Sequence, residues 1–69
     1  MDIVFTEHAK ERMKKRKISE EEVKEVIKYP EKTEKQEGLY YAKKNIQRAN
    51  IEVVYTKDKY IKVITVYYI

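Results

Sequence analysis

Three side chains near the start of the chain have the types and the spacing that phosphate chemistry requires. His8, Arg12 and Arg16 follow one another at intervals of four residues. On a helix with about 3.6 residues per turn, this spacing places all three along one stripe. Histidine serves as an acid or a base near neutral pH, and arginine binds phosphate through two parallel hydrogen bonds. The stripe therefore indicates either a site for a phosphate-bearing partner or the solvated surface of a basic helix.

Metal-independent cleavage of RNA needs little more than such a stripe. A base removes the proton of the 2′-hydroxyl, an acid protonates the leaving 5′-oxygen, and cations stabilise the charge that develops on the phosphate. The alternative is structural: the histidine caps or packs the helix, and the arginine stems cover apolar surface. Composition and spacing alone favour the structural alternative.

Other catalytic constellations lack their residues. The chain has one histidine, one glycine and no cysteine, which leaves neither a recognised set of zinc ligands nor a glycine-rich phosphate loop. The single serine, Ser19, is placed to cap a helix rather than to act as a nucleophile. The acidic residues gather on the outer face of a predicted helix, where solvation explains them. We therefore expect no metal ion and no cofactor.

Charge is segregated along the sequence. Residues 6–17 carry a net charge of +4, residues 19–37 carry −3 and residues 38–69 carry +4, which with Asp2 makes the total of +4. Two basic segments around an acidic one favour an anionic partner at one face. A charged fraction of 41%, rich in lysine and glutamate, also suggests a thermophilic source.

The length of 69 residues corresponds to one domain, residues 1–69, with a thin core that a dimer or a partner would enlarge. The N-terminal segment is too short and too acidic for a signal peptide. The longest apolar run is far shorter than the roughly 18 residues that a membrane span needs. Together with the absence of cysteine, these features predict a cytoplasmic protein that makes no membrane contact.

Two helices are predicted near the N-terminus. The first covers residues 6–17; its apolar positions are few, so one edge packs and the other faces stay available to solvent or a ligand. The second begins with a capping box of Ser19 and Glu22, runs to about Tyr29 and ends before Pro30. The two helices form a hairpin with a very short joint.

Four strands are predicted after the helices, over residues 31–37, 39–46, 51–56 and 60–68. Residues 3–5 are interpreted as an edge strand or as a lead-in that packs on the core. Simple alternation places Val63, Thr65 and Tyr67 on one face of the last strand. Both faces of that strand are largely apolar, which predicts a central position or an interface. The expected fold is α+β, with two N-terminal helices packed on a four-stranded antiparallel sheet.

Several segments share their spacing with a known family. The opening segment carries His8-Ala9, Arg12, Arg16, Ile18 and Glu21-Glu22-Val23, followed by Pro30. The segments 51–55 and 63–67 match the two closing strands of the same family. Over nearly its whole length, the chain thereby resembles the domain-of-unknown-function 4258 family. That family is similar in element order to the RelE/ParE superfamily of toxin–antitoxin systems, whose folds place two N-terminal helices on a small antiparallel sheet.

The resemblance implies a toxin-like protein that binds RNA. Such toxins typically cleave ribosome-bound mRNA as metal-independent endoribonucleases, whereas the ParE branch poisons DNA gyrase, and an acidic antitoxin is the usual partner. The last strand carries Lys62 and tyrosines where related RNase toxins carry arginines. The implied catalytic residues are His8, Arg12, Arg16 and Tyr67, and the implied RNA-binding residues are Lys15, Arg48 and Lys62.

The sequence also allows a second function. In this alternative the chain is a non-catalytic interaction module. Its tyrosine-rich last strand forms a homodimer or binds an antitoxin, because tyrosine is enriched at protein interfaces. In that case the stripe of His8, Arg12 and Arg16 is structural. Whether the chain is an enzyme is not decided by its sequence.

Overall fold

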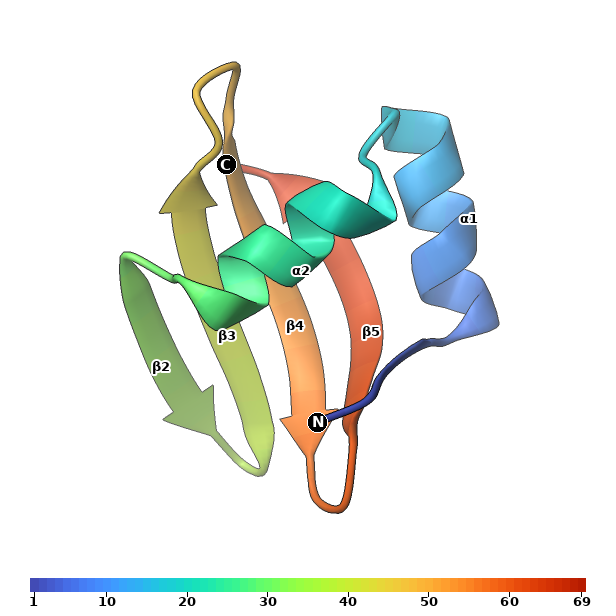
Figure 1. The fold of residues 1–69 in the computed structure, drawn as a ribbon, viewed down its shortest axis with the longest axis vertical. Helices are drawn as coiled ribbons and strands as arrows, with labels where there is room; N and C mark the ends of the chain where they lie inside the picture. Colours follow the sequence, from blue (N-terminus) through green and yellow to red (C-terminus); the bar gives the residue numbers. More distant parts are fainter.

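Two helices and five strands make up the structure, a computed structural model that describes residues 1–69. In chain order they are β1 (Ile3–Phe5), α1 (Glu7–Arg16), α2 (Glu20–Lys28), β2 (Lys32–Gln36), β3 (Leu39–Asn45), β4 (Asn50–Lys57) and β5 (Ile61–Tyr68). The strands form one sheet, α2 lies across its front, and α1 stands beside β5 (Figure 1). Both helices and the last four strands agree with the predicted bounds to within one residue.

The sheet differs from the four-stranded antiparallel sheet that the sequence predicted. β1 pairs in parallel with β5, Ile3 opposite Ile61 and Phe5 opposite Val63. The sheet is therefore mixed and five-stranded, in the order β1-β5-β4-β3-β2. The edge-strand alternative for residues 3–5 is confirmed, but the predicted sheet was wrong because it left this strand out, since its partner strand lies at the other end of the chain. The α+β class is confirmed.

The register of β5 against β4 shifts between Val63 and Thr65, so β5 accommodates Ile64 as an extra residue in a β-bulge. Beyond the bulge, Val66 lies in the core with Val63, and Tyr67 faces the other side of the sheet. The expectation that Val63, Thr65 and Tyr67 share a face was therefore wrong. Alternation along one strand does not reveal a bulge, because a bulge is a property of the pairing between two strands.

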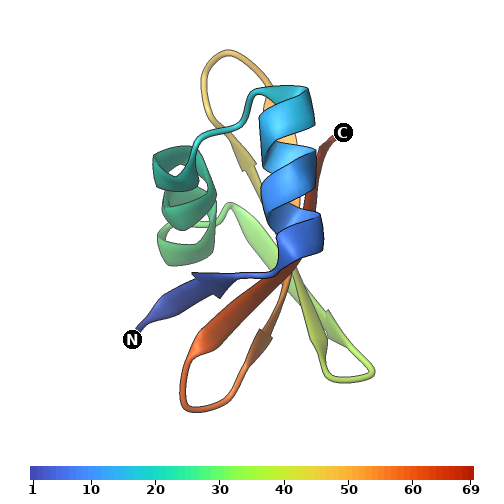
Figure 2. The same cartoon turned by 90° about the vertical axis from the view of Figure 1, so that its right-hand side faces the viewer.

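The helices cover different parts of the sheet. α2 packs on β3 and β4, whereas α1 runs along β5 (Figure 2). The N-cap of α1, Thr6, donates its backbone N–H to the Val63 carbonyl at 3.1 Å and its hydroxyl to the Ile64 carbonyl at 3.2 Å. β1 therefore protects the first half of the outer edge of β5, and the start of α1 protects the bulge.

Local signals explain where the helices begin and end. The Thr6 hydroxyl accepts a hydrogen bond from the Ala9 N–H, and Ser19 and Glu22 form the predicted capping box. α1 ends at Lys17, which takes a left-handed conformation with φ of 56°. Neither helix is both long and apolar enough to cross a membrane.

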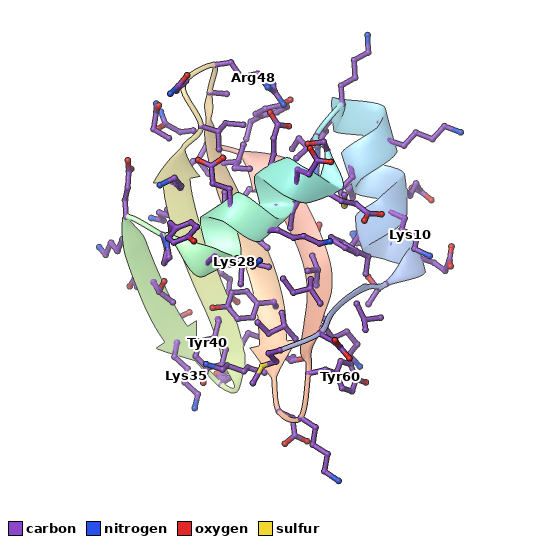
Figure 3. All side chains as sticks on the ribbon, in the orientation of Figure 1. Lys10, Lys28, Lys35, Tyr40, Arg48 and Tyr60 are labelled. Carbon is purple, nitrogen blue, oxygen red and sulfur yellow. The ribbon has the colours of Figure 1, made fainter.

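The core fills the space between the helices and the inner face of the sheet. Its largest fully buried side chains are Val23, Val26, Ile51, Val53, Val63 and Val66. At the lower end of the sheet, the rings of Tyr40 and Tyr55 stack with centroids 5.2 Å apart, and Lys35 lies over Tyr40 (Figure 3). Both α1 residues in the core, Ala9 and Met13, belong to the narrow apolar seam that the sequence predicted.

The sheet face opposite α2 carries no helix, and we call it the open face. It includes Tyr41, Glu52, Val54 and Tyr67. Glu52 and Val54 are buried even so, because Tyr67 and Tyr41 flank them on the neighbouring strands. The open face is thus a shallow, tyrosine-lined surface rather than a flat polar one.

Candidate functional site

The α1 stripe forms at successive turns of the helix, as its spacing predicts. His8 and Lys15 are exposed, and Arg12 and Arg16 are half-buried along the flank of the apolar seam. The Arg12 guanidinium lies 3.6 Å from the carboxylate of its sequence neighbour Glu11, a contact at the surface. His8 and Arg12 therefore remain available to a ligand.

Arg16 has a structural partner. Its Nη1 donates to the Val66 carbonyl of β5 at 2.8 Å, and its own carbonyl accepts from the Tyr68 hydroxyl at 2.5 Å. With the two hydrogen bonds of Thr6, these contacts tie α1 to the outer edge of β5 from end to end. Such a pairing satisfies backbone groups that an edge strand otherwise leaves open. Arg16 thus positions the stripe against the sheet.

Arg48 is the centre of a network that joins three parts of the chain. It lies in the loop between β3 and β4 (Figure 3). Its guanidinium binds both carboxylate oxygens of Glu22 at 2.8 and 2.9 Å, the Tyr68 hydroxyl at 3.1 Å and the Lys17 carbonyl at 3.0 Å. The fork geometry of a guanidinium matches a carboxylate in this way. Arg48 therefore holds the joint between the helices against the end of β5.

The same network shifts two pKa values. The hydrogen bond from Arg48 first, and then the backbone hydrogen bond from Ser19, together lower the pKa of Glu22 to about 2. The pKa of Arg48 is raised, first by its hydrogen bond with Glu22. Both shifts favour the charged forms, so the ion pair persists over the whole physiological pH range.

Tyr67 lies on the open face, where its hydroxyl donates to Glu52 Oε1 at 2.6 Å. Burial first, and then the hydrogen bond to the Glu52 carboxylate, together raise the pKa of Tyr67 to about 12. Glu52 is 9% exposed and is the one buried charged residue of the structure. Tyr67 is therefore held as a neutral hydroxyl group near neutral pH.

A hollow of about 220 Å³ opens beside this pair. Five side chains from four strands line it: Glu34, Gln36, Tyr41, Glu52 and Tyr67. Sequence reasoning had not singled out Glu52 or Tyr41. The signal was a charged residue between Ile51 and Val53 in a strand that is otherwise apolar, which requires a polar partner on one face.

The predicted site residues thus fall into separate groups. His8, Arg12, Lys15 and Arg16 share α1, Tyr67 belongs to the hollow, and Arg48 belongs to the network with Glu22. Lys62 is exposed on β5, opposite Val4 of β1. Through its hydrogen bond to the Val66 carbonyl, Arg16 contacts the residue that precedes Tyr67.

Two chemistries are available in this arrangement. α1 offers an exposed imidazole beside guanidinium and ammonium groups, which suits an anionic ligand. The hollow offers carboxylates and phenols, which suits a cationic one. No group of three or more histidine, cysteine, aspartate or glutamate side chains is placed to hold a metal ion.

Comparison with known proteins gives one match. Neither the curated proteins nor the solved structures include a protein that matches this chain. The family model described as "Domain of unknown function (DUF4258)" matches residues 5–68, which includes both helices and the last four strands. The chain belongs to this DUF4258 family.

Proposed function

We propose that this protein binds RNA through the exposed side of α1, as a small toxin-like protein of the RelE/ParE type. The observation that supports the proposal is that α1 buries only Ala9 and Met13. The six basic residues of the segment 6–17 therefore remain at one edge of the molecule, against two acidic residues. Phosphate contacts by such a basic ridge supply affinity without requiring a deep pocket.

A metal-independent endoribonuclease is the more specific form of this proposal. His8 is exposed and serves as the acid or base, and Arg12 binds the scissile phosphate. Arg16 acts as a positioning residue, because its guanidinium is bonded to the Val66 carbonyl. An assisting role for Tyr67 requires that RNA extend from α1 across β5 to the open face. Lys15 and Lys62 then contact phosphates along that path.

Binding is tested with a fluorescent single-stranded RNA and anisotropy at low salt. We expect the double variant Lys14→Gln/Lys15→Gln to bind more weakly than the unaltered protein. The matched control is Lys57→Gln/Lys59→Gln, which removes the same charge from exposed positions at the turn between β4 and β5. Equal weakening by both variants would contradict a site on α1, and no binding by the unaltered protein would end the proposal.

Cleavage is tested separately by expressing the protein with and without the substitution His8→Ala. The endoribonuclease proposal expects the unaltered protein to slow cell growth and to fragment mRNA, and the variant to do neither. His8 is exposed, so its replacement leaves the core intact and both proteins should accumulate to the same level. Identical growth with intact mRNA in both cultures would reject catalysis while leaving RNA binding to the anisotropy test.

A protein-interaction module is the second candidate, and β2 is the observation that favours it. All five residues of β2 are exposed, and its outer edge has no neighbouring strand. β5, on which the sequence placed the alternative interface, is paired with β1 and β4 and lined by α1, so strand pairing with a partner is available at β2 and not at β5. Light scattering tests this candidate by measuring the molar mass in solution. A dimer that Thr33→Pro converts to a monomer supports an interface at β2, since proline disrupts strand pairing.

A further inference from the structure

The hollow on the open face has a chemical character opposite to that of the protein as a whole. The chain has a net charge of +4 and sixteen lysine and arginine residues. None of them lines the hollow, whose walls are two carboxylates, two phenols and one amide. Because most charged residues of the protein are basic, its average composition does not explain a hollow lined by carboxylates. The residues that line the hollow therefore require an explanation of their own.

Glu52 is the group within the hollow that offers an open acceptor to a ligand. It is nine-tenths buried, and its Oε1 accepts the Tyr67 hydroxyl proton at 2.6 Å. Its other oxygen, Oε2, accepts no hydrogen bond from the protein. Lys43 lies directly opposite on β3 but forms no ion pair with it. No side-chain oxygen of the structure is both buried and without a hydrogen-bond partner, so Oε2 is accessible from the hollow, where it can accept a charge-assisted hydrogen bond from a bound cation.

The carboxylate of Glu34 and the two tyrosines of the hollow determine which kind of cation fits it. Glu34 stands on β2 opposite Tyr41, and Lys32 contacts it from outside the hollow at 3.7 Å. Tyr41 and Tyr67 also line the hollow, and the face of an aromatic ring attracts a cation. A guanidinium group is planar, stacks on aromatic rings and donates in pairs to carboxylates, whereas an ammonium group is a compact, strongly hydrated point charge.

We propose that this hollow binds a guanidinium group, carried either by an arginine side chain of a partner protein or by a small guanidino compound. The group stacks between Tyr41 and Tyr67 and donates to Glu52 Oε2, with Glu34 completing its neutralisation. The volume of about 220 Å³ accommodates the planar head and the first part of its stem. RNA binding is proposed for α1, and of the residues that line the hollow only Tyr67 has an assisting role in that proposal.

The test is a titration of the 15N-labelled protein with ethylguanidinium chloride, followed by amide shifts at low ionic strength. We expect saturable shifts centred on residues 34–36, 41, 52 and 67. The substitution Glu52→Gln should weaken binding about tenfold or more, as expected when a charge-assisted hydrogen bond is lost. The matched control Glu21→Gln alters an exposed carboxylate on α2 and should bind as the unaltered protein does.

Two further probes complete the experiment. Butylammonium chloride should bind more weakly than ethylguanidinium, and equal binding would overturn the assignment to a guanidinium. The peptide Gly-Arg-Gly should bind in the same hollow; tighter binding than ethylguanidinium identifies a protein side chain as the natural ligand, and weaker binding identifies a small compound.

Several results would overturn the proposal. These are shifts that do not saturate, shifts spread over the acidic residues of α2, or an affinity that Glu52→Gln leaves unchanged. If Glu52→Gln does not fold, Glu34→Gln takes its place, because Glu34 is exposed and its charge contributes to the same hollow. None of these outcomes depends on the α1 lysines, so failure here and failure of RNA binding are distinguishable.

Discussion

At the scale of single residues, Arg48 and Tyr67 form hydrogen bonds in the folded protein that the sequence does not reveal. Both were predicted to serve RNA. In the structure Arg48 forms hydrogen bonds with Glu22, Lys17 and Tyr68, and Tyr67 donates to Glu52. Each hydrogen bond joins residues at least 15 positions apart, which explains why sequence patterns do not reveal it.

The Arg48–Glu22 pair predicts a specific dependence of stability on acid. In the folded protein the pKa of Glu22 is about 2, below its ordinary value of 4.5. The pair therefore stabilises fully above pH 4.5, and its contribution is lost as the pH falls towards 2. We expect Arg48→Ala to unfold at a lower temperature near neutral pH and to lose less stability across this interval.

Thermal unfolding followed by circular dichroism at several pH values checks this expectation. Arg48→Lys is the informative control, since it keeps the charge but loses the fork that binds both Glu22 oxygens, and it should fall between the other two proteins. If Arg48→Ala retained the acid dependence of the unaltered protein, the pair would not be its source.

Tyr67 predicts a corresponding effect in alkali. Its pKa of about 12 lies above the ordinary value of 10.0, so its contribution is complete below pH 10.0 and is lost as the pH rises through about 12. Tyr67→Phe leaves the buried Glu52 carboxylate without its donor, which costs about 1–3 kcal/mol near neutral pH. Urea unfolding measures that loss, and the variant should lose less stability between pH 10.0 and 12.

A matched substitution separates this effect from the loss of any tyrosine hydroxyl. Tyr60→Phe removes a hydroxyl from an exposed position and should leave the free energy of unfolding within about 0.5 kcal/mol of its original value. Equal losses in the two variants would show that the hydrogen bond to Glu52 contributes nothing specific.

At the scale of secondary-structure elements, α1 lies along the outer edge of β5 and does not pack across a face of the sheet. Thr6 contacts the β5 backbone at Val63 and Ile64, and Arg16 contacts it at Val66. This placement follows from the narrow seam of Ala9 and Met13, which buries too little to hold a helix on a sheet face. The same narrow seam leaves His8 and the lysines of α1 exposed.

Thr6 is the residue at which this arrangement is tested. Its hydroxyl both accepts from the Ala9 N–H and donates to the Ile64 carbonyl. Thr6→Ala should cost about 1–2 kcal/mol in urea unfolding, the usual range for loss of an N-cap. Thr6→Ser keeps both hydrogen bonds and should cost much less, and equal costs for the two substitutions would show that the hydroxyl is not responsible.

At the scale of the whole molecule, the fold places the charged segments of the sequence in different parts of the structure. The basic segment 6–17 becomes α1 beside β5, and the acidic segment 19–37 becomes α2 and the edge strand β2, while the basic residues of segment 38–69 are spread over β3, β4, β5 and their loops. α1 is therefore a basic element separated by β4 and β3 from the acidic segment's edge strand, as the RNA proposal requires. Such a separation of charge orients an approaching polyanion as well as binding it.

This separation of charge predicts a measurable salt slope. Binding of single-stranded RNA weakens linearly in log Kobs against log salt concentration, by about 0.7 for each phosphate that the protein neutralises. Lys14→Gln/Lys15→Gln should therefore reduce the slope by about 1.4 in anisotropy titrations, if each lysine contacts one phosphate. The Lys57→Gln/Lys59→Gln control should keep the original slope, and a slope that no lysine substitution changes would indicate that α1 makes no phosphate contacts.

The sequence by itself determined the local structure. Caps, helix bounds, the last four strands and the exposed basic side of α1 follow from signals within a few residues, such as the Ser19–Glu22 capping box and Pro30. Such signals are readable because the interacting groups are neighbours in the chain.

The tertiary structure decided everything that joins distant segments. The parallel pairing of β1 with β5, the bulge at Ile64, the hydrogen bonds of Arg16 and Arg48 and the hollow around Glu52 all depend on contacts between the two ends of the chain or between neighbouring strands. The bulge alone separates Tyr67 from Val63, with which alternation predicted it to share a face, and places Tyr67 on the open face. The reason is physical: a side chain's chemistry is set by its own atoms, but its availability is set by the partners that folding brings to it.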